Sequence, residues 1–357
     1  MSHLLNRSNS SNLTSHQWCR QSSSPNRWPP RTAVVVIAVV LWLLGLSAGC
    51  TAQPDDDEPE PTLRERTEQQ QRNAEQLRQQ DEQQMRQEER KNLQNLIDRQ
   101  LEQGPWIDLR NLDLDLIRME VILDHQMLEG AEKLFLRGPT VDDEMVRTLA
   151  DDGLLMDLEV LKIDATSISD DTIHTLEQAP AMPALTRLHI GGGTITHLGV
   201  ELLLESGLLE GIESLSLSGK HIGDAGLRRI ADAAVPANLE TLHLSATGAT
   251  PRGIKTIANS EFAAAVDELD LSQNAIGTRG ANAIANAEML AELDTLKLRD
   301  SRISADGVAT LLHSPHLDEL RHLDLRDNPV DDATFAGLSA DAELPHLETL
   351  KPQLDTD

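Results

Sequence analysis

Tyrosine is absent from this 357-residue sequence, and aromatic residues make up only 2% of it. The core must therefore be built from aliphatic side chains, as in a narrow core of stacked leucines and isoleucines. Cysteine is nearly absent as well, since the chain has only Cys19 and Cys50. A framework of several disulfides is therefore excluded.

Basic residues are also scarce, because 31 lysines and arginines stand against 59 acidic residues and give a net charge of −28. Removal of the first 49 residues would remove four arginines and no acid, leaving −32. Such a field disfavours nucleic acid and anionic lipid headgroups as partners. It favours basic proteins or divalent cations, and solubility or a saline habitat accounts for it equally well.

What the chain does contain is a segment that recurs every 27 residues. Its first half reads LxxLxL, an alternation typical of a short strand with one buried face. Its second half carries a recurrent glycine followed four residues later by an aliphatic residue, which predicts a short helix. A fixed period of this length indicates a solenoid in which each unit buries its apolar edge against its neighbour. Units begin at Leu158, Leu185, Ile212, Leu239, Val266, Leu293, Leu320 and Leu347.

These residues resemble the leucine-rich repeats of the ribonuclease-inhibitor-like type, closely over 131–350 and poorly over 104–130. The resemblance implies an α/β solenoid with parallel strands on the concave face and short helices on the convex face. In that family an asparagine after the strand bonds the backbone of the turn, and Asn274 and Asn328 fit this position. The other units place different residues there, namely Pro139, Thr166, Gly193, Lys220, Thr247 and Ser301.

The N-terminal residues 1–49 have the pattern of an export signal. Arginines precede an apolar run over 33–48, and small residues precede Cys50. The ending LSAGC resembles a bacterial lipoprotein signal, in which Cys50 would be lipidated and begin the mature chain. The alternative is a signal anchor that stays in the membrane. Both interpretations predict an envelope protein whose repeats lie outside the cytoplasm, because arginines precede the run and DDDEPE follows it. In the lipoprotein interpretation, removal of Cys19 and lipidation of Cys50 also leave no free thiol or disulfide.

Two further segments separate this signal from the repeats. Residues 50–61 are acidic and proline-rich, which predicts an extended tether. Residues 62–103 are rich in Gln, Glu and Arg and predict a helical spacer, with a solvated helix or disordered spacer favoured over a dimerising coiled coil. The end of this spacer, with Leu93, Leu96, Ile97 and Leu101, is expected to cap the solenoid. The solenoid itself is assigned to 104–357, with a degenerate first unit over 104–130 and a truncated last one over 347–357, where Pro352 blunts the sheet edge.

The ligand-binding candidates lie on the predicted concave face. Strand residues between the leucines point away from the core, so equivalent residues of successive units form rows. The N-terminal third of these rows combines cations with a Trp and a Phe, which is typical of an interface, and the middle is small and polar. The alternative is that Trp106 and Phe135 are covered by the capping helix. The candidates are Trp106, Lys133, Phe135, Arg137, Lys162, Arg187, His189, Ser216, His243 and Asp270.

Ser216, His243 and Asp270 fall on consecutive strands and have the residue types of a catalytic triad. No nucleophile elbow or oxyanion donor is identifiable, and a flat row offers no pocket that excludes water. A metal pair of His189 and His243 is equally disfavoured. We therefore expect no catalytic residue, metal or cofactor.

These features predict a lipid-anchored envelope protein whose repeats bind a protein with an acidic surface, without catalysis. The sequence leaves its oligomeric state open. One alternative is regulation of a small GTPase, since the repeats also resemble those of the Ran GTPase-activating protein, although an export signal opposes it. A second alternative is a structural spacer.

Overall fold

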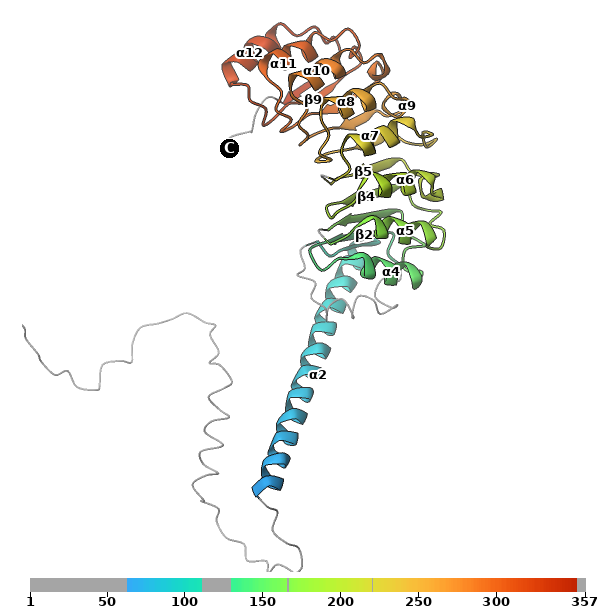
Figure 1. Ribbon diagram of the computed structural model, residues 1–357, viewed down its shortest axis with the longest axis vertical. Coiled ribbons are helices and arrows are strands. Elements are labelled where there is room, and N and C mark those ends of the chain that lie inside the picture. The colour runs from blue at the N-terminus through green and yellow to red at the C-terminus, as the bar shows by residue number, and fades with distance from the viewer. Residues whose placement is uncertain (1–62, 111–129, 166, 220, 352–357) are drawn as a thin grey trace, which may run out of the picture. The chain divides into compact units, whose positions relative to one another are not determined.

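The computed structural model describes residues 63–110, 130–165, 167–219 and 221–351 (Figure 1). The predicted signal over 1–49, the lipidation site Cys50, the tether over 50–61 and the edge-blunting Pro352 lie outside these residues. So do two turn positions, Thr166 and Lys220.

Ten short strands form one parallel sheet, and each strand pairs with the next one along the chain. Paired residues are 27 positions apart, as with Leu215, Leu242 and Leu269 on three neighbouring strands. This sheet confirms the predicted α/β leucine-rich-repeat solenoid. The strands are β1 (Trp106–Asp108), β2 (Lys133–Arg137), β3 (Val160–Asp164), β4 (Arg187–Gly191), β5 (Ser214–Leu217), β6 (Thr241–His243), β7 (Glu268–Asp270), β8 (Thr295–Lys297), β9 (His322–Asp324) and β10 (Thr349–Lys351).

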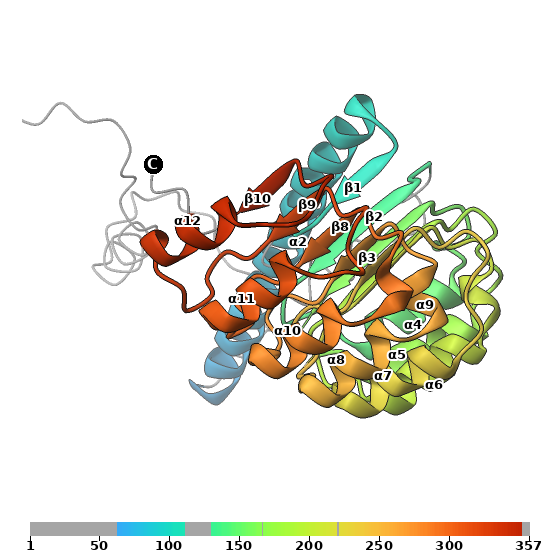
Figure 2. The same ribbon diagram turned by 90° about the horizontal axis from the view of Figure 1, so that it is seen from above.

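The helices of the repeats lie side by side along one face of this sheet (Figure 2). Most begin after a Ser, Thr or Asp whose side chain accepts a backbone N–H of the first turn, as Ser169 does from Asp171. The helices are α4 (Asp143–Asp151), α5 (Asp170–Gln178), α6 (His197–Glu205), α7 (Gly223–Asp232), α8 (Pro251–Ala258), α9 (Glu261–Ala264), α10 (Gly277–Ala285), α11 (Ala305–Leu312) and α12 (Asp332–Ala340), with 3-10 turns η1 (Gly207–Leu209) and η2 (Glu288–Leu290).

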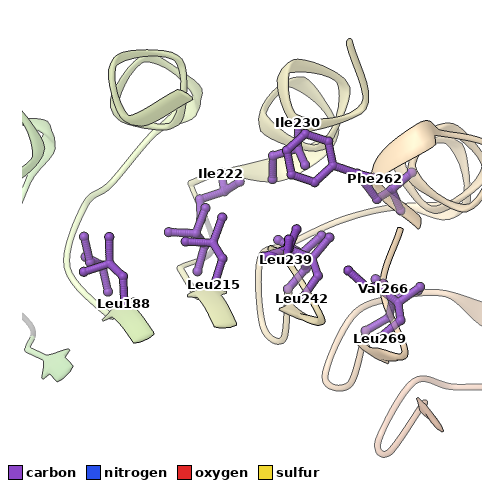
Figure 3. Packing of buried hydrophobic residues seen from close by; sticks show 14 of the residues in the cluster. Leu188, Leu215, Ile222, Ile230, Leu239, Leu242, Phe262, Val266 and Leu269 are labelled. Carbon is purple, nitrogen blue, oxygen red and sulfur yellow. The ribbon is translucent and has the colours of Figure 1, made fainter. Parts of the chain in front are cut away.

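The core is a continuous stack of aliphatic side chains between sheet and helices. Leu188, Leu215, Leu242 and Leu269 follow one another across four strands, each at most 1% exposed (Figure 3). The recurrent helix glycine lets neighbouring helices approach closely, since a Cβ at Gly307 of α11 would lie 3.2 Å from the Ala281 Cβ of α10. Burial of this ladder is the main stabilising term of the fold.

The two asparagines of the turn position behave as the resemblance implies. The Asn274 amide donates to the carbonyl oxygens of Leu244 and Leu271 at 2.8 and 2.9 Å, and its oxygen accepts the Ala249 N–H at 3.1 Å. Asn328 repeats this pattern two repeats later, donating to Leu298 O at 2.8 Å. Each asparagine therefore joins two successive units and satisfies buried backbone groups of both.

A second link between units was not foreseen from the sequence. The Asp170 carboxylate accepts the N–H and the hydroxyl of Thr196, the N-cap of the next helix, at 2.8 and 2.6 Å. Asp143 does the same for Ser169, and Asp224 for Thr250. Burial raises the pKa of the Asp143 carboxyl, but the hydrogen bonds from Thr172 and Ser169 outweigh it, so that pKa is lowered. The sequence signal for this link was the recurrence of Asp143, Asp170 and Asp224 at multiples of 27 residues.

Helix α2 (Leu63–Gln103) precedes the first strand. Leu93 and Ile97 near its end are buried in the core of the repeats, and the Gln100 side chain accepts the Asp108 N–H at 2.7 Å and donates to its carbonyl at 3.0 Å. The chain is helical here, so the disordered alternative for the described part of the spacer is wrong. No helix among the described residues is both long and apolar enough to cross a membrane.

Candidate protein-binding surface

The strand pairing brings the predicted surface residues together as expected. Successive partners across the sheet run from Asp108 through Phe135, Lys162 and His189 to Ser216, and the row continues to His243 and Asp270. The adjacent row contains Trp106, Lys133 and Arg187. All ten candidates therefore lie on three neighbouring rows of one face of the sheet, Arg137 being on the third row.

We call Lys133, Phe135, Lys162 and Arg187 the basic concave cluster. Their side chains come from three adjacent strands, β2, β3 and β4, and all four are at least partly exposed. None of the three cations forms an ion pair with another residue in the part of the chain that is described. The neighbouring Arg137 lies 3.6 Å from Asp164, an exposed and therefore weak contact.

Phe135 and Trp106 are neither fully covered nor fully exposed. The Arg110 guanidinium lies over the Phe135 ring, 5.0 Å from its centre, in cation–π contact. Hydrogen bonds from Arg110 in turn lower the pKa of the Asp108 carboxyl. The Trp106 ring lies against Gly104, where a Cβ would come within 2.9 Å of the indole. Part of the surface of each ring therefore remains exposed to solvent and open to a binding partner.

His189 borders the cluster and is bound internally. Its Nδ1 lies 2.6 Å from the Ser216 hydroxyl, and Ser216 is only 7% exposed. Burial and the nearby Lys162 charge lower the pKa of His189 to about 4. His189 is therefore neutral at physiological pH, and Ser216, predicted as an exposed contact, leaves little surface for a ligand.

The candidate triad does not form. Ser216 bonds His189, whereas His243 Nε2 lies 2.7 Å from a carboxylate oxygen of Glu268. Asp270 instead accepts the backbone N–H of Ser272 at 2.8 Å. Stacking places the three residue types on adjacent strands, but each side chain has a different partner. Among the described residues, no group of three or more His, Cys, Asp or Glu side chains is arranged to hold a metal ion.

Three cations on the C-terminal part of the same face, Lys297, Arg299 and Arg326, each pair with an acid. Lys297 and His243 share Glu268, with Lys297 Nζ 2.5 Å from its carboxylate. Burial raises the pKa of Glu268, but these two hydrogen bonds outweigh it and lower that pKa. Arg299 pairs with Asp327 at 2.5 Å and Arg326 with Asp324 at 2.6 Å. Among the described residues, the cations of these rows without an ion pair are therefore Lys133, Lys162 and Arg187 on β2 to β4, and Lys351 on the last strand, β10.

Sequence comparison recognises the repeats only locally. Residues 266–285 match the family model described as Leucine Rich repeat. No curated protein sequence gave a significant match. Together with the ten-stranded register, the match defines a leucine-rich-repeat scaffold.

Three solved structures illustrate the similarity in fold. A protein from Bacteroides fragilis is 16% identical with a TM-score of 0.45, covering 60% of this chain and 70% of that one. Internalin InlF of Listeria monocytogenes is 16% identical with a TM-score of 0.35, covering 67% and 75%. Internalin C2 of the same organism is 16% identical with a TM-score of 0.35, covering 64% and 84%. Similarity at this level carries no conclusion about function.

Proposed function

We propose that this chain is a lipid-anchored scaffold of the bacterial envelope whose basic concave cluster binds a protein with an acidic surface. The observation that carries the proposal is a contrast within one face. Lys133, Lys162 and Arg187 have no acidic partner among the described residues, whereas Lys297, Arg299 and Arg326 each have one. A net charge of −28 already keeps the chain soluble, so solubility does not explain why cations without a described acidic partner surround a half-exposed ring.

The chemistry of the cluster favours a protein ligand over a small molecule. Aromatic and arginine side chains dominate the energetics of protein interfaces. A sheet face of short strands also presents its side chains in evenly spaced rows. An acidic partner would be drawn to this face by long-range attraction, so its association should slow as salt rises.

The anchoring part of the proposal is supported by the sequence alone. The lipoprotein-like ending LSAGC places the lipid on Cys50, and the acidic residues that follow place the repeats outside the cytoplasm. The alternation of strand and helix in a 27-residue unit supports assignment to the ribonuclease-inhibitor-like type.

The experiment is crosslinked capture of envelope proteins by variants of the full chain. Lys162→Glu combined with Arg187→Glu should abolish capture of the partner, because it turns unpaired cations into acids. The matched control is Lys297→Glu with Arg299→Glu, on the same face and with the same change in charge. Equal loss of capture in both pairs would show that the site is misplaced. Unchanged capture in both would favour the structural-spacer alternative.

A further inference from the structure

A second surface feature lies on the helices and does not involve the concave face. The repeats are 27 residues long, so residues 27 positions apart occupy equivalent places in the first turns of the helices of successive units. Neighbouring helices pack side by side, about 10 Å apart. One residue from the first turn of each of six helices, α4 to α8 and α10, belongs to what we call the helix-start row: Glu144, Asp171, Leu198, Ala225, Arg252 and Arg279.

The order of residues along this row is self-complementary. Within these six helices two acids stand at one end, two arginines at the other, and two apolar residues in the centre, and Asp306 follows at the equivalent position of α11. A two-fold axis between α6 and α7 would place Leu198 opposite Ala225 of a second copy. The same axis would place Asp171 opposite Arg252 and Glu144 opposite Arg279 of that copy. Such a pattern, in which residue i meets residue j and j meets i, is what an isologous dimer interface requires.

The side chains of the row are available for this contact. Leu198 at its centre is 54% exposed, one of few large apolar side chains exposed in the described part of the chain. Asp171, Arg252 and Arg279 are exposed and form no ion pair with another described residue. Glu144 pairs only with Arg147 on its own helix, an exposed pair of little energetic weight.

We propose that two copies of this chain associate through the helix-start row. The chain is strongly acidic, so two copies repel each other over most of their surface. The arginine end of the row is a place where an acidic copy is attracted, and its own Asp171 and Glu144 are the matching charges. Farther along the helices, Glu205 would face Asp232 of the second copy, so the contact is confined to the N-terminal turns.

The test is the mass of the full chain in detergent, measured by sedimentation equilibrium over a range of concentrations. The wild type should dimerise. Asp171→Arg and Arg252→Asp should each raise the dimer dissociation constant about tenfold or more, because like charges then meet at both symmetry-related contacts. Mixed in equal amounts, the two variants should form a dimer again, since both contacts become oppositely charged. Arg321→Asp, which changes the net charge by the same amount as Arg252→Asp but lies outside the row, should leave the constant unchanged.

Three results would overturn the proposal. One is a wild type that stays monomeric at every concentration. Another is dimerisation of both single variants at wild-type strength. The third is a mixture that remains monomeric although each variant keeps its wild-type circular dichroism. If a single variant misfolds, the double variant Asp171→Arg/Arg252→Asp replaces it, and failure of that folded double variant to dimerise is equally decisive. None of these outcomes depends on the concave face.

Discussion

His189 and His243 occupy the same row of the sheet, two repeats apart, and yet their surroundings differ. His189 is buried beside the Lys162 charge and bonds a neutral hydroxyl of Ser216, whereas His243 bonds the Glu268 carboxylate. The strand pattern places both rings but does not determine which neighbour each one contacts. The charge of a residue on this face therefore depends on its immediate partners.

The depressed pKa of His189 predicts a dependence of stability on pH. The unfolded chain binds a proton on this residue near pH 6.5 and the folded chain only near pH 4. The stability contributed by neutral His189 is therefore full above pH 6.5 and is lost as the pH falls towards 4. Urea unfolding between about pH 7.5 and about pH 4.5 should show that the wild type loses about 2–3 kcal/mol more than His189→Gln does.

The control for this prediction is His346→Gln, at an exposed position. It should lose as much stability over this interval as the wild type does. If His189→Gln also matched the wild type, protonation of His189 would not be linked to folding.

Within the elements, the strands and their pairing could be predicted from the sequence because a period of 27 leaves one register that keeps every leucine buried. The asparagine turns followed from the family resemblance. Burial of Ser216 and Ser272, each 7% exposed, could not be predicted, because alternation alone puts both on the open face. The Ser272 hydroxyl accepts the Arg299 N–H of the next unit at 3.2 Å, a contact that depends on local backbone geometry.

The aspartate links between helices predict a stabilising role for Asp224. Its carboxylate accepts the N–H and hydroxyl of Thr250 at 2.8 and 2.6 Å and the Gly253 N–H at 3.1 Å. Asp224→Ala should therefore lower the free energy of unfolding by about 1–3 kcal/mol, since charged hydrogen bonds between two units are lost. Asp232→Ala, in the last turn of the same helix, is the control and should not destabilise. Equal losses in thermal or urea unfolding would mean that the links contribute nothing.

At the scale of the whole molecule, this acidic chain has two separate surfaces with cations that form no ion pair with another described residue. They are the basic concave cluster and the arginine end of the helix-start row. The basic concave cluster includes the Phe135 ring, and the arginines of the helix-start row lie on α8 and α10, in the same row as the exposed Leu198 of α6. The negative net charge alone keeps the chain soluble, so solubility explains neither of these two positively charged surfaces. The two surfaces therefore carry the two proposed contacts, one with a different protein and one with a second copy.

The anchoring proposal predicts the effect of replacing Cys50. Without the thiol no lipid can be attached, so Cys50→Ser should release the chain from membranes or leave it unprocessed, as membrane fractionation would reveal. The control is Cys19→Ser, within the segment expected to be removed, which should leave the mature protein unchanged. Mass spectrometry of a wild-type chain that begins at Met1 would contradict the proposal.

The most direct measurement of the central claim is site-specific photocrosslinking in intact cells. A photoreactive phenylalanine analogue at Phe135 would report contacts of the basic concave cluster, and the same analogue at Thr295 would report the C-terminal part of the same face. The account predicts a crosslinked protein from position 135 that disappears with Arg187→Glu and is absent from position 295. An equally strong crosslink from position 295, or none from position 135, would contradict the claim that this cluster is the binding surface.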